Sequence, residues 1–435
     1  MREDTTYALN LHSIPAASRT SPIKCRLGVY LGADLDHMVR PPTKVSKERE
    51  NLAEITVEEP QRVGASLRYS SVIESNEVGT RRLWFEVPEE FSGWVTDLAD
   101  PFLVANLFQM MSEGEDVHVR GDLSAGLIEP LQAFMDLWSS WRPDRCRPIA
   151  ISADRWIKNR RPETDEAAML FSGGLDAQTS LQRHLREEAG DRTRSIGACI
   201  YTRGFMNGLA DSPRYRAALC KTAESVRFFG KEKIPLIALV SNWQELNTRT
   251  MPDSIGPGLI SFLHLFKARF RHGLLASSMT YSDLRIYGSH PFSDPLLGHE
   301  DFRVESDDPT SSRLDKALYL SDKPEALERL LICHQFDDAA RNCGRCEKCY
   351  RTALCFMVHG KDVPKSIPID WDECRRKKAY RKTFREDPEA SRELFQRIRR
   401  DRMKAPELVR FQNQYRLQTS KQLIKNLLTT WGLRD

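Results

Sequence analysis

Residues 167–176, with the sequence AAMLFSGGLD, decide the fold of the region around them. Five apolar residues in a row are typical of a buried strand, and two consecutive glycines follow shortly after them. Glycine adopts positive φ without strain and lets the backbone come close to a ligand. A helix that begins directly after the glycines directs its free N–H groups at an anion. The stretch therefore predicts a strand, a phosphate-binding loop and a helix.

The loop at residues 172–176 differs from two familiar nucleotide-binding loops. It has no Gly-Lys-Ser/Thr, as a Walker A loop would, and it lacks the third glycine of a dinucleotide fingerprint. Asp176 falls at the expected start of the helix, where it can cap the helix or bind Mg²⁺. A plain Gly-Gly turn with a capping aspartate would explain the same residues.

The residues after the loop alternate between helical and apolar segments. This alternation is typical of βαβ units, in which helices connect parallel strands, and it predicts an α/β fold for residues 164–360. We expect strands at 167–171, 196–201, 234–240 and 284–287, and helices at 177–188, 217–229 and 258–272, the last with Gly273 as its C-cap.

The two flanks have other patterns. Residues 1–163 are expected to form a separate α+β domain that docks a partner or substrate, with a linker at 160–166. Residues 361–435 are expected to be helical and basic. The elements expected in the first flank are strands at 24–31, 66–73, 81–87 and 148–152 and helices at 97–111 and 130–139.

Four cysteines lie close together with the spacing C-x9-C-x2-C-x2-C, and Gly344 permits the turn between them. Two CxxC steps that share a cysteine form a tight knuckle, and four thiolates complete a closed tetrahedral site, which suits structural Zn²⁺. An Fe–S cluster also uses four cysteines and stays open as an alternative. The expected metal ligands are Cys333, Cys343, Cys346 and Cys349.

Two known families share these motifs. The loop at 172–176 resembles the SGGxDS loop of the PP-loop ATP pyrophosphatases, although Ala177 stands where that family usually has serine. Together with the cysteine pattern about 160 residues later, it resembles the QueC family of 7-cyano-7-deazaguanine synthases over roughly residues 165–360. The resemblance implies a Rossmann-like parallel sheet of the adenine nucleotide alpha hydrolase (HUP) type.

The same resemblance implies a reaction and its cofactors. With Mg²⁺, ATP would be cleaved between its α and β phosphates to adenylate a 7-deazaguanine carboxylate, which an amine then attacks, so the chain would be a C–N ligase. Thr179 and Ser180 are the candidates to supply the hydroxyl missing at Ala177. The residues expected to bind ATP are Ser172, Gly173, Gly174, Leu175, Asp176 and Thr179, and Asp176 is also expected to be catalytic.

Two further segments are candidates for the site. Residues 287–297 correspond in position to the segment that holds the deazapurine in QueC-like proteins, so His290 and Asp294 are candidate catalytic residues that read the base edge or move a proton. A rigid polar loop would explain them equally well. Arg313 and Lys316 follow a pair of serines, and they either meet phosphate or lie on a solvated helix face.

The long flanks bear on the acceptor. QueC-like proteins with such flanks occur in bacterial antiphage systems, among them Qat and CBASS operons, and this resemblance implies a protein N-terminus as the amine, supplied by a partner from the same operon. Three alternatives stay open. They are a small-molecule 7-cyano-7-deazaguanine synthase for queuosine biosynthesis, a PP-loop tRNA thiolase, and a zinc-bearing scaffold without catalysis.

Charge and hydropathy narrow the class of partner and the location. The chain has 65 Lys and Arg against 61 Asp and Glu, so a basic surface for nucleic acid would have to be local. Residues 374–404 contain 13 Lys and Arg against 5 Asp and Glu, but acidic neighbours and few aromatics favour a solvated helix face over nucleic-acid contact. No stretch reaches the ~20 apolar residues of a membrane span. We expect a cytoplasmic protein without membrane contact.

Overall fold

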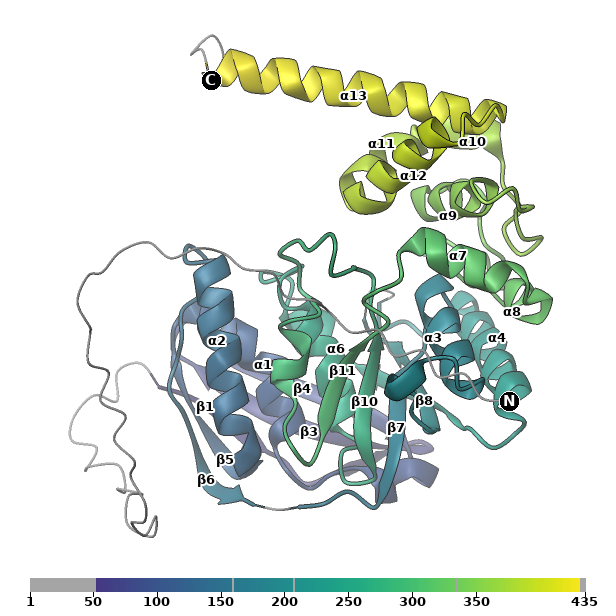
Figure 1. Ribbon diagram of the computed structural model, residues 1–435. Helices are drawn as coiled ribbons and strands as arrows, with labels where there is room; N and C mark the ends of the chain where they lie inside the picture. The colour runs from purple at the N-terminus through teal and green to yellow at the C-terminus, as the bar shows by residue number, and fades with distance from the viewer. Residues whose placement is uncertain (1–51, 159, 206–207, 334, 431–435) are drawn as a thin grey trace, which may run out of the picture. The chain divides into compact units, whose positions relative to one another are not determined.

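The computed structural model describes residues 52–158, 160–205, 208–333 and 335–430, with side chains as far as residue 421 (Figure 1). These residues belong to one compact unit that begins at Arg49. The strand expected at 24–31 lies outside the described residues. The described strands are β1 (Leu52–Val57), β2 (Gln61–Val63), β3 (Ser66–Ser75), β4 (Gly79–Pro88), β5 (Asp116–Ser124), β6 (Ile151–Ile157), β7 (Thr164–Leu170), β8 (Ile196–Arg203), β9 (Leu236–Ser241), β10 (Phe270–Ala276) and β11 (Arg303–Asp307).

The helices cover the faces of this sheet and form the C-terminal part of the chain (Figure 1). None of them, within the described residues, is long and apolar enough to cross a membrane. Their bounds are α1 (Asp100–Glu113), α2 (Ile128–Trp141), α3 (Leu175–Leu185), α4 (Pro213–Gly230), α5 (Trp243–Leu246), α6 (Ile255–His264), α7 (Arg313–Ser321), α8 (Pro324–Glu328), α9 (Glu347–Met357), α10 (Trp371–Arg376), α11 (Ala379–Glu386), α12 (Pro388–Arg400) and α13 (Pro406–Thr430).

The eleven described strands form one large, mostly parallel sheet in the order β11-β10-β7-β8-β9-β4-β3-β1-β5-β6, with β2 paired to β3. The five strands from β11 to β9 are parallel to their neighbours, and β4 joins β9 in antiparallel fashion. The expected α/β class, with a mostly parallel sheet and a helical C-terminus, is therefore confirmed. The chain leaves β7 toward β8 and β9 and later returns on the other side of β7, so the strand order reverses beside β7.

Strand β7 is buried on both faces, as its unbroken apolar run predicts. Its successive side chains point to opposite faces. Ala167 and Met169 therefore pack with α3 and α4, whereas Ala168 and Leu170 pack with α1 and α6. The glycine loop consequently leaves the sheet at a fixed point between two packed layers.

The two sides of the expected domain boundary at 163/164 share the sheet. Asn242 extends the β4–β9 pairing, because its side chain accepts from the Trp84 N–H (3.0 Å) and donates to the Arg82 carbonyl (2.8 Å). Beneath the sheet, the ammonium of Lys267 is buried against the Asp100 carboxylate at the start of α1. Part of the expected linker also belongs to a strand, since β7 begins at Thr164.

Two expected elements are wrong. The helix expected over 258–272 ends at His264, and β10 begins at Phe270, so Gly273 lies inside a strand and caps nothing. Helical spacing of apolar residues continues past the break because both the helix and the strand are buried, which hides the boundary from the pattern. Residues 284–287, expected as a strand, form an irregular connection between β10 and β11.

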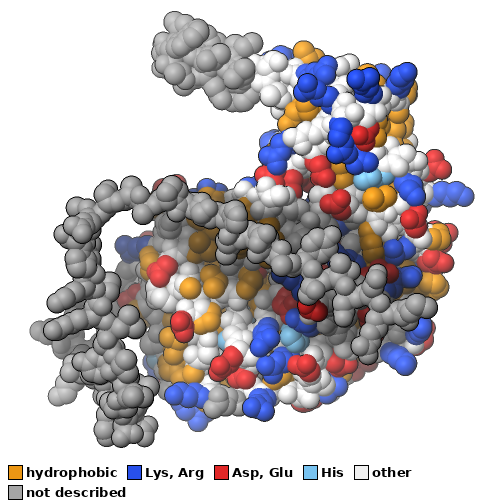
Figure 2. Space-filling model, in the orientation of Figure 1, with side chains coloured by type: hydrophobic (Ala, Val, Ile, Leu, Met, Phe, Trp, Pro, Cys, Tyr) orange, Lys and Arg blue, Asp and Glu red, His pale blue; other side chains and the backbone are white. Residues whose placement is uncertain are grey.

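The C-terminal helices are basic on their surface, and Figure 2 shows Lys and Arg side chains gathered over them. Many of these cations pair with carboxylates of the same helices, as Arg375 does with Glu407 (2.8 Å) and Arg397 with Asp401 (2.7 Å). Phe384, Leu394 and Phe411 form the core of this region together with residues of α9. The helices thus continue the packing of α9.

Candidate active site and metal centre

A cavity of about 390 Å³ opens at the carboxyl ends of β7, β8 and β10. In open α/β sheets ligands bind at this edge, beside the point where the strand order reverses. The floor is formed by strand ends such as Leu170, Tyr201 and Ala276. The cavity therefore lies where the topology of the sheet predicts a ligand.

The glycine loop forms one wall of the cavity. Gly173 has φ +75°, a conformation that favours glycine, and its carbonyl accepts a hydrogen bond from the Leu331 N–H (2.9 Å). Gly174 occupies the N-cap position of α3, so the free N–H groups of the first turn lie at the cavity. Ser172, Leu175 and Asp176 also line the wall. This is the strand, loop and helix that the sequence predicts.

Four cationic side chains line the same cavity, and they come from three helices. Arg214 is in the first turn of α4, Arg313 is the first residue of α7, and Lys348 and Arg351 belong to the first half of α9. Among the described residues, Asp176 is the one carboxylate in the lining. A cavity with this balance of charge is suited to a polyanion.

Asp176 is ion-paired. One carboxylate oxygen lies 3.3 Å from the Arg313 guanidinium, and the other lies 3.3 Å from Nζ of Lys316. Burial opposes ionisation of this carboxyl, but the charges of Arg313 and Lys316 outweigh burial and hold its pKa below the usual range. Asp176 is the second residue of α3 and does not occupy the N-cap position.

Lys316 and Arg313 are placed by the capping box of α7, in which Ser312 and Asp315 exchange hydrogen bonds. Lys316 is 2% exposed, and its ammonium also donates to the Ser277 carbonyl. Lys316 is thus buried, and Arg313 lines the cavity. The alternative of a solvated helix face is therefore wrong for both residues.

The residues expected near the glycine loop differ in their placement. Ala177 lines the cavity, so the position where the family has serine does face the ligand space. Thr179 is 1% exposed, lies outside the cavity lining, and its hydroxyl has no hydrogen-bond partner among the described residues. Ser180 is turned away and donates to Asp307. Neither hydroxyl replaces the one absent at Ala177.

His290 and Asp294 lie outside the cavity lining. His290 is 3% exposed and packs against Trp141 of α2, with ring centroids 4.7 Å apart. The Asp294 carboxylate accepts from the His290 N–H (3.0 Å) and from the Ser289 hydroxyl (2.8 Å). Burial raises the pKa of Asp294 to about 7. These contacts are those of a rigid polar loop, and a catalytic role for either residue stays a prediction.

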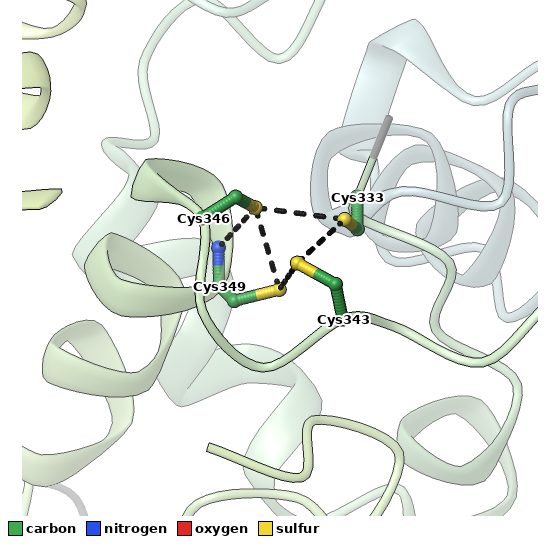
Figure 3. Close-up of side chains that lie close together, drawn as sticks. All are labelled: Cys333, Cys343, Cys346 and Cys349. Atoms are coloured by element: carbon green, nitrogen blue, oxygen red, sulfur yellow. Dashed lines mark hydrogen bonds between the residues drawn. The ribbon is translucent and has the colours of Figure 1, made fainter. Parts of the chain in front are cut away.

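The four predicted cysteines converge (Figure 3). Their sulfur atoms lie within 4.8 Å of one another, with close pairs at 3.3 Å (Cys333 and Cys343), 3.5 Å (Cys333 and Cys346) and 3.6 Å (Cys346 and Cys349). A tetrahedral ion with Zn–S bonds of about 2.3 Å needs sulfurs about 3.8 Å apart. The cluster could therefore hold such an ion after small adjustments.

The cysteine cluster adjoins the cavity. Cys333 belongs to the cavity lining, and Cys346 is the N-cap of α9, where its sulfur accepts from the Cys349 N–H. Gly344 makes the turn at φ +63°. Two of the four cavity cations, Lys348 and Arg351, thus stand on a helix whose N-cap and first turn contain two of the four candidate metal ligands. The sequence shows that Lys348 and Arg351 are close to the cysteines along the chain. It does not show that their side chains line the same cavity as the glycine loop.

Part of the cavity lining is apolar. Ile200, Phe205 and Leu259 form it, and Phe205 stacks on the buried Trp243 with ring centroids 5.0 Å apart.

No family model, curated protein or solved structure matches this chain.

Proposed function

We propose that this chain is an ATP-dependent, AMP- and pyrophosphate-forming enzyme that activates a carboxylate and joins it to an amine. One observation carries the proposal. The glycine loop at the start of α3 faces Arg214, Arg313, Lys348 and Arg351 across a single cavity. Helix N-termini and clustered cations are the groups that bind and stabilise phosphates.

The proposed chemistry has two steps. A carboxylate oxygen attacks the α-phosphorus of ATP, the bond from that phosphorus to the oxygen bridging to the β-phosphate breaks, and pyrophosphate leaves. The amine nitrogen then attacks the acyl carbon, AMP leaves, and the nitrogen loses a proton. The N–H groups at Gly174 and Leu175, with Lys348 and Arg351, would stabilise the charge that grows on the pyrophosphate.

Mg²⁺ when bound would neutralise phosphate charge. Asp176 is the lining carboxylate that fits it, but both of its oxygens already face Arg313 and Lys316. Mg²⁺ commonly keeps several waters and binds through one or two carboxylates together with substrate phosphates. Asp176 would therefore act mainly by holding the two cations, with at most one oxygen for the ion.

The apolar part of the cavity lining supports a flat heteroaromatic group on one of the substrates. The resemblance to QueC proteins supplies the carboxylate class, a 7-deazaguanine carboxylate. The long flanks favour a protein N-terminus in antiphage defence as the amine, and ammonia in queuosine biosynthesis is the alternative. A tRNA thiolase is less well supported, because Cys333 is the one cysteine that lines the cavity among the described residues, and it belongs to the metal cluster.

Zn²⁺ is the proposed occupant of the cysteine cluster. Four thiolates leave no open position, so the ion would be structural and would fix the start of α9. The three residues of α9 that reach the cavity, Lys348, Arg351 and Thr352, would depend on it.

The test is AMP and pyrophosphate formation from MgATP and 7-carboxy-7-deazaguanine, with ammonium or a peptide with a free N-terminus as acceptor. Lys348→Met should lower turnover by roughly 10- to 100-fold, since a charge-assisted contact contributes about 1.5–3 kcal/mol. Lys365→Met, at an exposed position after α9, is the matched control and should leave turnover unchanged. Wild-type protein that neither binds MgATP nor releases pyrophosphate would refute the proposal, and binding without turnover would favour the scaffold alternative.

A further inference from the structure

We propose that Asp387, in the C-terminal helical region, is a positioning residue of the nucleotide site that aims Arg313 and Arg351 into the cavity. The inference rests on the proposed function, because it concerns the same cavity. Asp387 precedes α12 and lies well outside residues 164–360, which contain both motifs that the sequence identifies.

Asp387 uses both of its carboxylate oxygens. Oδ1 accepts from the Ala390 N–H at 3.1 Å and so caps α12. Oδ2 lies 3.0 Å from Nε of Arg313 and 3.3 Å from Nη1 of Arg351. The side chain is 6% exposed, so water screens these pairs weakly. One carboxylate oxygen is therefore ion-paired, without a hydrogen bond, to two of the four cations that line the cavity.

Arg313 lies between two carboxylates. Its Nε lies 3.0 Å from the Asp387 carboxylate and its Nη2 lies 3.3 Å from Asp176, and both contacts are ion pairs without a hydrogen bond. If the Asp387 charge were removed, the guanidinium would be free to turn and form a two-pronged pair with Asp176 alone. Arg313 would then be withdrawn from the phosphates, and Asp176 would be less available to Lys316. Arg351, 4% exposed, would lose the one carboxylate within salt-bridge distance among the described residues.

Residues of α11 and α12 also contact the segment after β10 and the residue that precedes Arg313. Thr280, in the segment after β10, donates to Glu389, and Arg285 of the same segment donates to the Glu386 carbonyl at 3.1 Å. Ser312, directly before Arg313, donates to Glu393 at 2.9 Å. The C-terminal region therefore contacts the surroundings of the site through α12, its N-cap Asp387 and the last residue of α11.

Two effects of removing the Asp387 charge oppose each other. Loss of a negative charge makes the cavity more positive, which by itself would tighten the binding of a polyanion. Loss of the anchor lets both arginines leave their positions, which weakens binding. The positioning role requires the second effect to dominate. Contacts between a guanidinium group and a phosphate are short and directional, so they would fail when the arginine side chains turn. The sign of the change in affinity therefore decides the matter.

The experiment compares Asp387→Asn with wild type in the full-length protein. Asparagine caps helices about as well as aspartate, so α12 should stay intact, but two cations lose their carboxylate and the melting temperature should fall. We expect MgATP and inorganic pyrophosphate to bind about 10- to 100-fold more weakly. Adenosine lacks phosphates, so its inhibition constant in the pyrophosphate-release assay should be unchanged. Glu386→Gln is the matched control, because it removes the same charge one residue earlier from an exposed side chain and should alter nothing.

Asp387→Glu provides a second measurement that keeps the charge but moves it. It should bind MgATP several-fold more weakly than wild type and more tightly than Asp387→Asn, and it serves alone if the asparagine variant does not fold. Unchanged or tighter MgATP binding by Asp387→Asn would overturn the positioning role, as would an equal loss of adenosine inhibition. If wild type itself binds neither MgATP nor pyrophosphate, the proposed function fails instead, so the two failures are distinguishable.

Discussion

Removal of the proposed Zn²⁺ is expected to weaken the proposed nucleotide binding strongly, although no metal ligand needs to touch the nucleotide. The perturbation is Cys349→Ser, which deletes a buried thiolate from the cluster and leaves the other three. Cys346 caps α9 and Cys349 lies in its first turn, so without the ion the first turn of α9 loses its anchor. Lys348 and Arg351 then lose their fixed positions in the cavity wall.

The magnitude follows from these two cations. A hydrogen bond to a charged group contributes about 1.5–3 kcal/mol, so the loss of both amounts to about 3–6 kcal/mol. Since every 1.4 kcal/mol is a factor of ten, the dissociation constant for MgATP should rise by at least about a hundredfold. The assay is isothermal titration calorimetry with MgATP, beside metal content by mass spectrometry.

The chain offers a matched control in a cysteine of α10 that contacts the knuckle. Cys374 is also buried, and its thiol donates to the Gly344 carbonyl at 3.4 Å, but it is not one of the four converging cysteines. Cys374→Ser should keep both the metal and the affinity for MgATP. A metal-free Cys349→Ser protein that binds MgATP as wild type does would refute the coupling between the cluster and the cavity.

Three further predictions concern single positions. Ala177→Ser adds a hydroxyl at the cavity and should tighten pyrophosphate inhibition about three- to tenfold; an unchanged inhibition constant would mean that the hydroxyl does not reach the phosphates. Burial raises the pKa of Asp294 to about 7, from about 3.9 in the unfolded chain. The free energy of unfolding of wild type should therefore fall by up to about 4 kcal/mol between pH 4 and pH 7, relative to that of Asp294→Asn. Equal pH dependence of the two proteins in urea unfolding would contradict this. Gly344→Ala places a Cβ against the Pro368 carbonyl in a left-handed turn, so it should lower both the melting temperature and zinc content, whereas full retention of both would show that the turn adapts.

The parts of the site that could be predicted are encoded locally. The strand, glycine loop and helix around Gly173 are contiguous, and each carries its own signal of apolar run, positive φ and helix start. The cysteine knuckle is equally local, because its spacing alone predicts that the four sulfur atoms can converge. Both features depend on short-range geometry, which one sequence is enough to reveal.

The parts that could not be predicted depend on long-range packing. The boundary between α6 and β10 is hidden because both elements are buried, so one apolar pattern runs through them. The cavity cations are separated from the glycine loop by well over a hundred residues, except Arg214, and nothing in their own neighbourhood shows which way they face. For His290 and Asp294 the local sequence suggests a site, but long-range packing places them outside the cavity. Trp141 and the hydrogen bonds within the loop hold them there.

The electrostatics of the cavity extend beyond the region in which its motifs are found. The glycine loop and the cysteine cluster end by residue 349, yet Arg313 and Arg351 both depend on a carboxylate at residue 387. A chain cut at residue 360 would keep every motif residue but leave the buried Arg351 and the partly buried Arg313 with Asp176 and Glu347 as their nearby counter-charges. Buried cations without partners are costly, so the truncated site would relax away from the cavity geometry. The C-terminal flank is therefore better treated as part of the proposed nucleotide site than as a module attached to it.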